Sequence, residues 1–427
     1  MTNKLLDDLN ARGLIAQRTA ESDLDEHLQE SRYVYCGFDP TADSLHIGTL
    51  VPLLMLRRFQ LAGHRPIAVV GGSTGLIGDP SFKDAERQLN GKEIVDQWCD
   101  RLKAQISQFI DFEGDNAAIM ANNYDWTGNM SVLDFMRDVG KHFSVNNMIQ
   151  KESVKQRIER EGSGISFTEF SYMLMQSWDF AELYRLYNCT IQIGGSDQWG
   201  NITGGIDLTR RIHGAQVFGL TMPLITKADG TKFGKTEAGT VWLDPSKTSP
   251  YSFYQFWLNA ADADVYNFLR YFTFLSAQEI AAIEAADQAR DGRPEAQSVL
   301  ATAVTELVHG KDSLAAAKRI TEALFSGDLN ALTSADCEQL ELDGLSASEL
   351  GGLAGQPLTS LFAEVGLAKN GSQVKDALQR KAVIVNGVAI GLEQNMDAEN
   401  IFSSKNALHK KYFVVRLGKK SYHLFKL

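Results

Sequence analysis

Cysteine is scarce in this chain and occurs in no metal-binding pattern. The 427 residues include four cysteines, Cys36, Cys99, Cys189 and Cys337. They are widely separated and form no Cys-x-x-Cys pair, which argues against both a zinc ribbon and a disulfide framework. We therefore expect a cytoplasmic protein without a protein-bound metal cluster.

Long apolar runs are also missing. The longest, such as residues 50–56, are far shorter than the roughly 20 residues that span a membrane. Asp7 and Asp8 stand where the apolar segment of a signal peptide would begin, so we expect neither a secretory signal nor membrane attachment. The composition, 44% hydrophobic and 22% charged, is typical of a globular protein, and the length predicts two or three domains.

The charge is negative overall but not uniform. The formal net charge is −11, which argues against nonspecific nucleic-acid binding by the whole chain. Residues 351–427 carry 11 Lys and Arg against 5 Asp and Glu, a net charge of +6. This basic tail predicts one local contact with nucleic acid. The alternative is a solvated, lysine-rich terminus, although the tail is also apolar and patterned.

The first half of the chain predicts an α/β fold. Residues 32–245 alternate between short apolar segments and amphipathic ones, which indicates a Rossmann-like parallel sheet with helices on both faces. The expected strands are residues 33–38, 66–72, 118–120, 190–195 and 217–225. The expected helices are residues 50–61, 85–110 and 131–140. Ligands of such sheets bind beyond the carboxyl ends of the strands, where the strand order reverses.

The second half predicts an all-α domain and then a small α+β domain. The expected helices of the small domain are residues 358–365 and 372–380. A strand at residues 382–387 ends in Asn386-Gly387, a strong hairpin signal, and apolar segments follow at 412–417 and 422–425. The predicted domains are residues 1–245 (catalytic), 246–335 (helical), 336–355 (linker) and 356–427 (basic, RNA-binding).

Residues 39–49 form the first of five candidate site motifs. A strand ends, a turn follows, and His46 stands where a helix opens. Helix N-termini carry free N–H groups and bind phosphate, and Gly48 lets a flat ring approach the backbone. These features suit an adenine nucleotide. The alternative is that His46 only caps or packs.

Residues 71–80 form a second, glycine-rich motif, followed by Lys83 and Arg87. Its spacing differs from the dinucleotide fingerprint. It is either a glycine-lined approach to a ligand, with Asp79 facing that ligand, or a tight loop.

Residues 167–180 predict a helix that is apolar nearly all round and therefore buried. Tyr172, Gln176 and Asp179 fall on one face of it. Leaving a buried polar group unpaired costs about 1–3 kcal/mol, so these three need partners. Either a bound polar ligand or a neighbouring strand would supply them.

Two further polar motifs follow strands. Residues 194–201 offer hydrogen-bonding side chains at a strand end, for a sugar or amide contact or for a plain turn. Residues 228–236 nearly match a P-loop, but three residues separate Gly230 from Gly234 where that loop needs four. A mobile loop with two lysines can instead close over a triphosphate, while a solvated turn is the alternative.

Together the five motifs resemble the class I aminoacyl-tRNA synthetases. His46-Ile47-Gly48-Thr49 resembles the family's His-Ile-Gly-His element. Residues 232–236, Lys-Phe-Gly-Lys-Thr, resemble its Lys-Met-Ser-Lys-Ser loop in the form found in bacterial tyrosine enzymes. Residues 172–179 and 194–201 resemble the tyrosyl branch, and the similarity runs in order over essentially the whole chain. This sequence departs from the family pattern at Thr49, which replaces the second histidine. A threonine cannot carry the charge of a histidine.

The resemblance implies a role for each matching residue. Tyr35 and Asp179 would bind the tyrosine phenol, and Tyr172, Gln176 and Asp79 its ammonium group. Residues implied to shape the tyrosine and adenylate pockets are Gly37, Asp39, Thr41, His46, Gly48, Asn123, Gly195, Asp197, Gln198 and Lys235. Residues implied to act on the reacting phosphates and the pyrophosphate are His46, Thr49, Lys83, Arg87, Lys232, Lys235 and Thr236.

The same resemblance implies two in-line displacements. Tyrosine carboxylate would attack the α-phosphate of ATP, and the terminal ribose of a tyrosine tRNA would then attack the adenylate. Positioning and charge stabilisation suffice for this chemistry, so the lack of an obvious Ser–His–Asp set is no obstacle. Mg²⁺ is expected on the ATP phosphates. A homodimer is implied, with residues 132–149 as its contact.

Three rival interpretations stay open on the sequence. A tryptophanyl synthetase shares the ATP motifs but has no reason for a phenol acceptor at Asp179. A nucleotidyltransferase acting on a small cofactor would not need the helical domain or the basic tail. A nonenzymatic RNA-binding protein would need no polar face on a buried helix.

Overall fold

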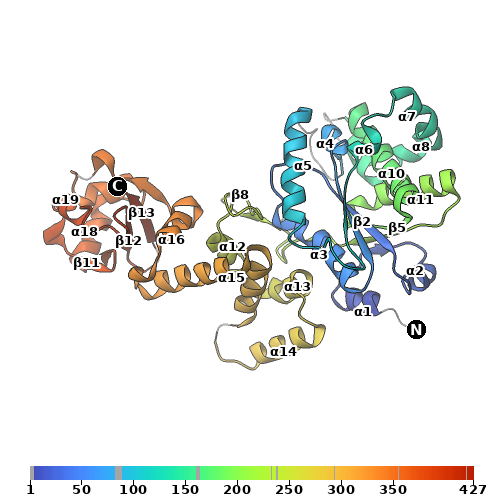
Figure 1. Ribbon diagram of the computed structural model, residues 1–427. Coiled ribbons are helices and arrows are strands. Elements are labelled where there is room, and N and C mark those ends of the chain that lie inside the picture. Colours follow the sequence, from blue (N-terminus) through green and yellow to red (C-terminus); the bar gives the residue numbers. More distant parts are fainter. Residues whose placement is uncertain are drawn as a thin grey trace. The chain divides into compact units, whose positions relative to one another are not determined.

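The chain folds into two compact units. The computed structural model describes residues 4–81, 89–159, 164–231, 233–236, 239–292, 294–353, 355–419 and 421–427. The first unit comprises Met1–Leu243 with Asp262–Pro294, and the second comprises Asp244–Ala261 with Glu295–Leu427. Figure 1 follows the chain through both.

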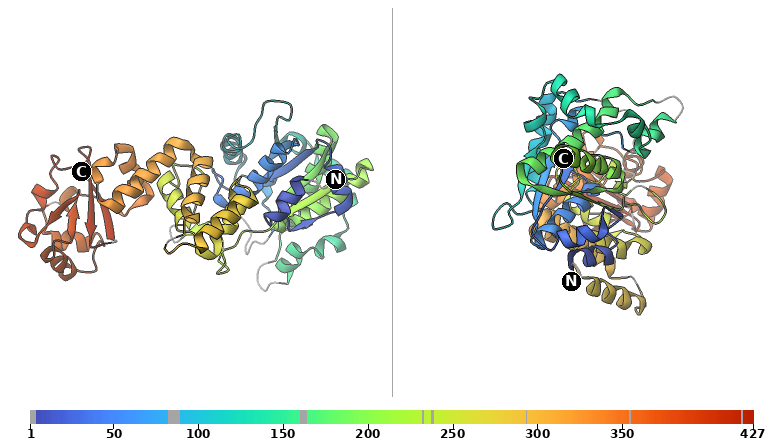
Figure 2. Two further views of the ribbon diagram at one scale, coloured as in Figure 1. Left: turned by 90° about the horizontal axis from the view of Figure 1, so that it is seen from below. Right: turned by 90° about the vertical axis from the view of Figure 1, so that its right-hand side faces the viewer.

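The first unit is built on a six-stranded sheet in the order β1-β6-β5-β2-β3-β4. Its strands are β1 (Gln17–Arg18), β2 (Tyr33–Phe38), β3 (Arg65–Val70), β4 (Ile119–Asn122), β5 (Cys189–Gly195) and β6 (Phe218–Met222). All neighbours pair in parallel except β1 with β6. The strand order reverses between β2 and β5, and sheets of this kind bind ligands beyond the carboxyl ends of the strands at such a point. Figure 2 shows the blue and green strands side by side.

Helices cover both faces of this sheet. The helices α3 (Ile47–Leu61) and α5 (Lys92–Ile106) contact β3, while α10 (Phe167–Tyr187) and α11 (Trp199–His213) contact β5. Phe180 and Leu183 of α10 pack with Tyr35 and Ile67 of the sheet in one buried cluster. In Figure 1, β2 and β5 lie between these two helical layers. The predicted doubly covered parallel sheet is therefore confirmed.

Shorter elements complete the first unit. They are α1 (Lys4–Ala11), α2 (Glu21–His27), α4 (Thr74–Ile77), α6 (Tyr124–Thr127), α7 (Val132–Asp138), α8 (Val145–Ile149), α9 (Glu152–Ile158), α13 (Asp262–Phe272), α14 (Ala277–Gln288), and the hairpin strands β7 (Lys235–Thr236) and β8 (Gly239–Thr240). The helix predicted at residues 85–110 is shorter in the structure, where α5 begins at Lys92. Residues 82–88 lie outside the described part of the chain.

The second unit combines helices with a five-stranded sheet in the order β11-β10-β12-β13-β9. The strands are β9 (Ala347–Glu349), β10 (Val383–Val385), β11 (Val388–Ile390), β12 (Tyr412–Leu417) and β13 (Ser421–Lys426). The helices are α12 (Pro250–Leu258), α15 (Ala296–Ser326), α16 (Ser334–Gln339), α17 (Leu358–Glu364), α18 (Gly371–Gln379) and α19 (Ala398–Ile401). Asn386 and Gly387 both have positive φ between β10 and β11, so the predicted hairpin turn is confirmed.

The compact units divide the chain differently from the predicted domains. The helices α13 and α14 belong to the unit that holds the parallel sheet, because α13 packs against α3. Residues 347–349, inside the predicted linker, form β9 and pair with β13. The polar sequence Ala-Ser-Glu carries no strand pattern, so only the pairing reveals it. Among the described residues no helix is long and apolar enough to cross a membrane.

Candidate active site

The first motif opens α3, and His46 is its N-cap residue. The imidazole Nδ1 accepts a hydrogen bond of 3.0 Å from the backbone N–H of Gly48. A neutral imidazole held this way carries its proton on Nε2, which can then donate to a nucleotide oxygen. The hydroxyl of Thr49 donates to the backbone oxygen of His46 at 2.6 Å. The capping role considered for His46 is thus real, and it orients the ring.

Asp39, just after β2, is bonded to Thr74, which follows β3, and to Tyr172 of α10. Its Oδ1 accepts from the Thr74 hydroxyl at 2.6 Å, and its Oδ2 accepts from the Tyr172 hydroxyl at 2.7 Å. Gly71 must lack a side chain here, because a Cβ would lie 2.1 Å from Oδ1 of Asp39. Burial, and then the charge of Asp39, raise the pKa of Tyr172 well above its ordinary value. Thr74 was not singled out in the sequence.

The same network continues to Asp179 in the middle of α10. Asn123, which follows β4, donates from Nδ2 to Oδ2 of Asp179 at 3.0 Å and to the Thr74 hydroxyl at 3.0 Å. Its own Oδ1 accepts from the N–H of Ser73 at 2.7 Å. Nε1 of Trp126 donates to Oδ1 of Asp179 at 2.8 Å. Both carboxylate oxygens of Asp179 are therefore held by donors from the β4 end of the sheet.

Asp179 is buried, with 5% of its surface exposed. Burial raises its pKa to about 7, against the lowering effect of the donors Asn123 and Trp126. The sequence reasoning missed Trp126. The available signal was an indole N–H three residues beyond Asn123, at the same strand end.

Tyr35 supplies an unpaired phenol in this region. Its side chain is almost fully buried on β2, and its hydroxyl has no hydrogen-bond partner among the described residues. Its ring packs edge-on against Phe180 of α10 with centroids 5.2 Å apart. Burial, and then the nearby Asp179, raise the pKa of Tyr35 well above its ordinary value. A buried hydroxyl left unpaired is costly, so the site is suited to a ligand with a matching polar group.

A second polar chain runs along α10 and the β5 end. Nδ2 of Asn201 donates to Oε1 of Gln176 at 3.0 Å and to Oε1 of Gln198 at 3.1 Å. Nε2 of Gln198 donates to Oδ2 of Asp79 at 2.7 Å. The structure thus brings Gln176, Gln198 and Asp79 together through Asn201, which sequence reasoning did not single out for this role. Tyr172 belongs to the first network instead, through Asp39.

Other residues expected to shape the pocket lie at the carboxyl ends of β2 and β5. Gly37 is in β2, and the N–H of Thr41 bonds the backbone oxygen of Asp39 at 2.9 Å. Gly195 ends β5 and packs on Asp197 so closely that a Cβ would lie 2.4 Å from its Oδ1. This contact favours glycine at the entrance to α11.

The segment that follows the lysine-rich motif (residues 228–236) is paired with the backbone around His46. The N–H of Ile47 bonds the oxygen of Val241, and the N–H of Leu243 bonds the oxygen of Leu45, both at 2.9 Å. The rings of His46 and Trp242 stand edge to face, 6.3 Å between centroids. The structure describes the backbone of Lys235 and Thr236 in β7. Lys83, Arg87 and Lys232 lie outside the described residues.

Within the described residues, no group of three His, Cys, Asp or Glu side chains is placed to hold a metal ion. Cys36, Cys99, Cys189 and Cys337 are buried free thiols.

Two family models match the chain. The model described as tRNA synthetases class I (W and Y) matches residues 28–326, which include every strand of the parallel sheet from β2 onward. The chain belongs to this family. A second model, the SYY-like C-terminal domain of tyrosine–tRNA ligase, matches residues 336–425 of this synthetase.

Relatives of this class I synthetase extend over its whole length. It is 62% identical over 426 residues to a tyrosine–tRNA ligase of Aliivibrio fischeri (strain MJ11), covering 99% of each chain. It is 60% identical over 423 residues to the tyrosine–tRNA ligase of Chromobacterium violaceum, covering 98% of each. A crystal structure of a C-terminally truncated mitochondrial tyrosyl-tRNA synthetase of Aspergillus nidulans superposes with a TM-score of 0.68 at 29% identity. It covers 76% of this chain and 95% of that one.

Proposed function

We propose that this chain is a tyrosine–tRNA ligase, which activates tyrosine with ATP and transfers it to the 3′-terminal adenosine of its tRNA. The observation that carries this proposal is the buried pair of Tyr35 and Asp179. Full-length relatives with the same printed activity support it.

The phenol of tyrosine binds between Tyr35 and Asp179. It donates its proton to the carboxylate that Asn123 and Trp126 hold, and it pairs with the otherwise unpartnered hydroxyl of Tyr35. Phenylalanine would leave both protein groups unpaired in a buried site, and tyrosyl-tRNA synthetases are themselves the established example of this discrimination. Tryptophan has no hydroxyl to offer either, which disfavours the tryptophan-specific member of the family.

The ammonium group of tyrosine binds to Tyr172, Gln176 and Asp79. In the structure these side chains already accept or donate hydrogen bonds within the site, so substrate binding exchanges one set of partners for another. When the ammonium group binds Asp79, the amide of Gln198 either gives up its hydrogen bond to Asp79 or shifts together with that side chain. The acceptors are therefore already in place before the cation arrives.

ATP binds beyond the carboxyl ends of β2 and β5, with its phosphates toward the N-terminus of α3. Asp39, Thr41, Gly37, Gly48, Gly195 and Asp197 line the adenylate pocket. Nε2–H of His46 and the hydroxyl of Thr49 act at the α-phosphate, and Lys83, Arg87, Lys232, Lys235 and Thr236 stabilise the departing pyrophosphate. Mg²⁺ travels with the ATP phosphates and is held mainly by phosphate and water.

The basic C-terminal region binds the tRNA.

Two chains assemble into a homodimer in the cytoplasm. Large apolar side chains are exposed on α7, where Leu133 is 80% and Val132 74% exposed. Val145 and Ile149 on α8 are also exposed. Exposed apolar side chains on two consecutive helices are typical of a protein interface.

Pyrophosphate–ATP exchange, run with each of the twenty amino acids and with none, tests the proposal. Exchange that depends on tyrosine alone is the expected result. Exchange with tryptophan or another amino acid would keep the adenylation chemistry and overturn the substrate. No exchange with any amino acid would point to an RNA-binding protein that has kept the scaffold.

A further inference from the structure

The segment that leads into the lysine-rich motif is bound to α13. The backbone N–H of Ala228 donates to Oδ1 of Asp264, in the first turn of α13, at 2.7 Å. Asp264 is only 6% exposed. A hydrogen bond to a buried carboxylate is among the stronger ones in proteins, so this contact holds one end of the motif.

Phe233, inside the motif, packs on the same helix. Its ring is stacked on Phe272 with centroids 5.2 Å apart and tilted against Phe268 at 5.0 Å. Phe268 and Phe272 are both buried. The motif is therefore attached to α13 at two points, one polar and one aromatic.

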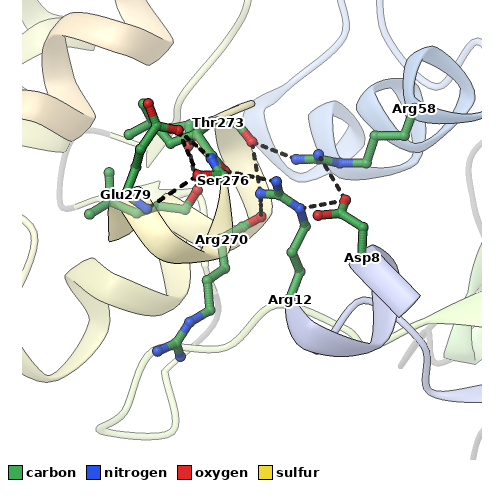
Figure 3. Close-up of polar contacts among 9 residues, drawn as sticks. Asp8, Arg12, Arg58, Arg270, Thr273, Ser276 and Glu279 are labelled. Atoms are coloured by element: carbon green, nitrogen blue, oxygen red, sulfur yellow. Dashed lines mark hydrogen bonds and ion pairs between the residues drawn. The ribbon is translucent and has the colours of Figure 1, made fainter. Parts of the chain in front are cut away.

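The far end of α13 is fixed to the helix that His46 caps. Arg12 of α1 donates to the backbone oxygens of Arg270, Thr273 and Leu275 at 3.3, 3.4 and 2.8 Å. Arg58, near the end of α3, also donates to the oxygen of Thr273. Figure 3 shows the two guanidinium groups side by side, pointing at the end of α13.

Asp8 provides a carboxylate to both arginines, with Oδ2 at 2.8 Å from Arg12 and 3.9 Å from Arg58. The remaining positive charge faces the carbonyl oxygens at the helix C-terminus, where a cation is favoured. Ser276 and Glu279 then begin α14 with a capping box, so the chain is fixed on both sides of the turn. These contacts fix the C-terminal end of α13 to α1 and α3.

We propose that α13 is the fixed seat of the lysine-rich motif, and that Asp264 and Phe233 are positioning residues for adenylate formation. This inference rests on the proposed function, because the motif acts on the phosphates of ATP there. The two catalytic motifs then share one rigid frame: α3 carries His46 at its start, and α13, bound to the end of α3, carries the loop. Neither Asp264 nor Phe233 touches a substrate in this proposal.

Asp264→Ala removes the acceptor, and Asp264→Asn retains an acceptor oxygen. We expect Asp264→Ala to lower kcat/KM for ATP in pyrophosphate exchange by roughly tenfold, as for one lost hydrogen bond to a charged group. The KM for tyrosine should stay unchanged, and Asp264→Asn should recover most of the loss. Asp262→Ala is the matched control, since Asp262 lies one half-turn earlier and is exposed.

Phe233→Ala tests the aromatic attachment without altering α13, and Phe233→Leu restores part of the apolar contact. We expect the alanine variant to affect ATP and not tyrosine, and the leucine variant to lie between it and the parent. Hydrogen–deuterium exchange of a peptide covering residues 222–231 should be faster in both Asp264→Ala and Phe233→Ala.

Hydrogen–deuterium exchange separates this inference from the proposed function. Parent protein without tyrosine-dependent activity would defeat the function, while faster deuteration in the two variants would still support the seat. Unchanged deuteration together with an unchanged KM and kcat for ATP would overturn the seat. An equal loss for tyrosine and ATP, not rescued by Asp264→Asn, would also overturn it, because it would indicate general destabilisation.

Discussion

Asn123 and Asp179 are joined by a hydrogen bond of 3.0 Å that connects the end of β4 to the middle of α10. Burial raises the pKa of Asp179, and the Asn123 donor opposes that effect. In the proposed pocket, selection of a phenol thus depends on a residue that need not touch the substrate.

Asp179→Ala should depress tyrosine activation strongly. The change removes the phenol acceptor and leaves Asn123 and Trp126 without theirs, and a charged hydrogen bond contributes about 1.5–3 kcal/mol, so we expect roughly a 100-fold loss in kcat/KM for tyrosine. Pyrophosphate exchange measures it. Normal tyrosine activation by a folded variant would refute the assignment of the pocket.

Asn123→Ala should weaken tyrosine binding less, by about tenfold, because one donor to Asp179 remains. The KM for tyrosine should rise while the KM for ATP stays near that of the parent. Gln108→Ala removes an exposed amide elsewhere and serves as the control. An equal rise in both KM values would show that Asn123 acts on the whole site and not on Asp179.

Stability should depend on the ionisation of Asp179. Its folded pKa, about 7, is above the ordinary value of 3.8, so between these two values the folded state binds more protons than the unfolded state. The contribution of this carboxyl is therefore fully present below about pH 4 and is lost as the pH rises through about 7. Asp179→Asn has no such dependence. Urea unfolding should show the variant gaining stability relative to the parent, on the order of 4 kcal/mol, between about pH 4 and about pH 8. A constant difference across that range would contradict the assigned pKa.

Removal of residues 351–427 should spare tyrosine-dependent exchange and cripple tRNA charging. The strands that supply the C-terminal sheet lie in this segment, apart from β9, and none belongs to the parallel sheet. Unchanged charging by the truncated chain would refute the role of the tail.

Substitution of exposed lysines tests the same role of the C-terminal region without removing any of its strands. Lys369, Lys375 and Lys405 are exposed, and changing all three to alanine should weaken tRNA binding and reduce its dependence on salt. Exchange without tRNA should be unaffected. A salt dependence equal to that of the parent would place the RNA contact elsewhere.

Leu133→Glu should convert a dimer into monomers. A carboxylate at the most exposed apolar position of α7 would be buried in the proposed interface at a large cost. Sedimentation equilibrium checks this, with the exposed Leu61→Glu as the control. A parent protein that is already monomeric would refute the dimer.

Local patterns predicted most of the fold. The apolar segments at residues 33–38 and 412–417 coincide with β2 and β12, because a buried strand needs a short apolar run wherever it lies. They could not reveal β1, which has two residues, or β9, whose sequence is polar. Such strands exist because a neighbouring edge offers hydrogen bonds.

The sequence by itself determined the α/β class, the family and the kinds of side chain in the site, because motif spacing and hydrophobic period are local properties. Only the tertiary structure decided which groups meet. Asp39 bonds Tyr172, 133 residues later, and Asp79 bonds Gln198, 119 residues later. It also assigned α13 to the unit of the parallel sheet and revealed Trp126 on Asp179. Partners this distant are fixed by strand order and helix packing, which no short stretch of sequence encodes.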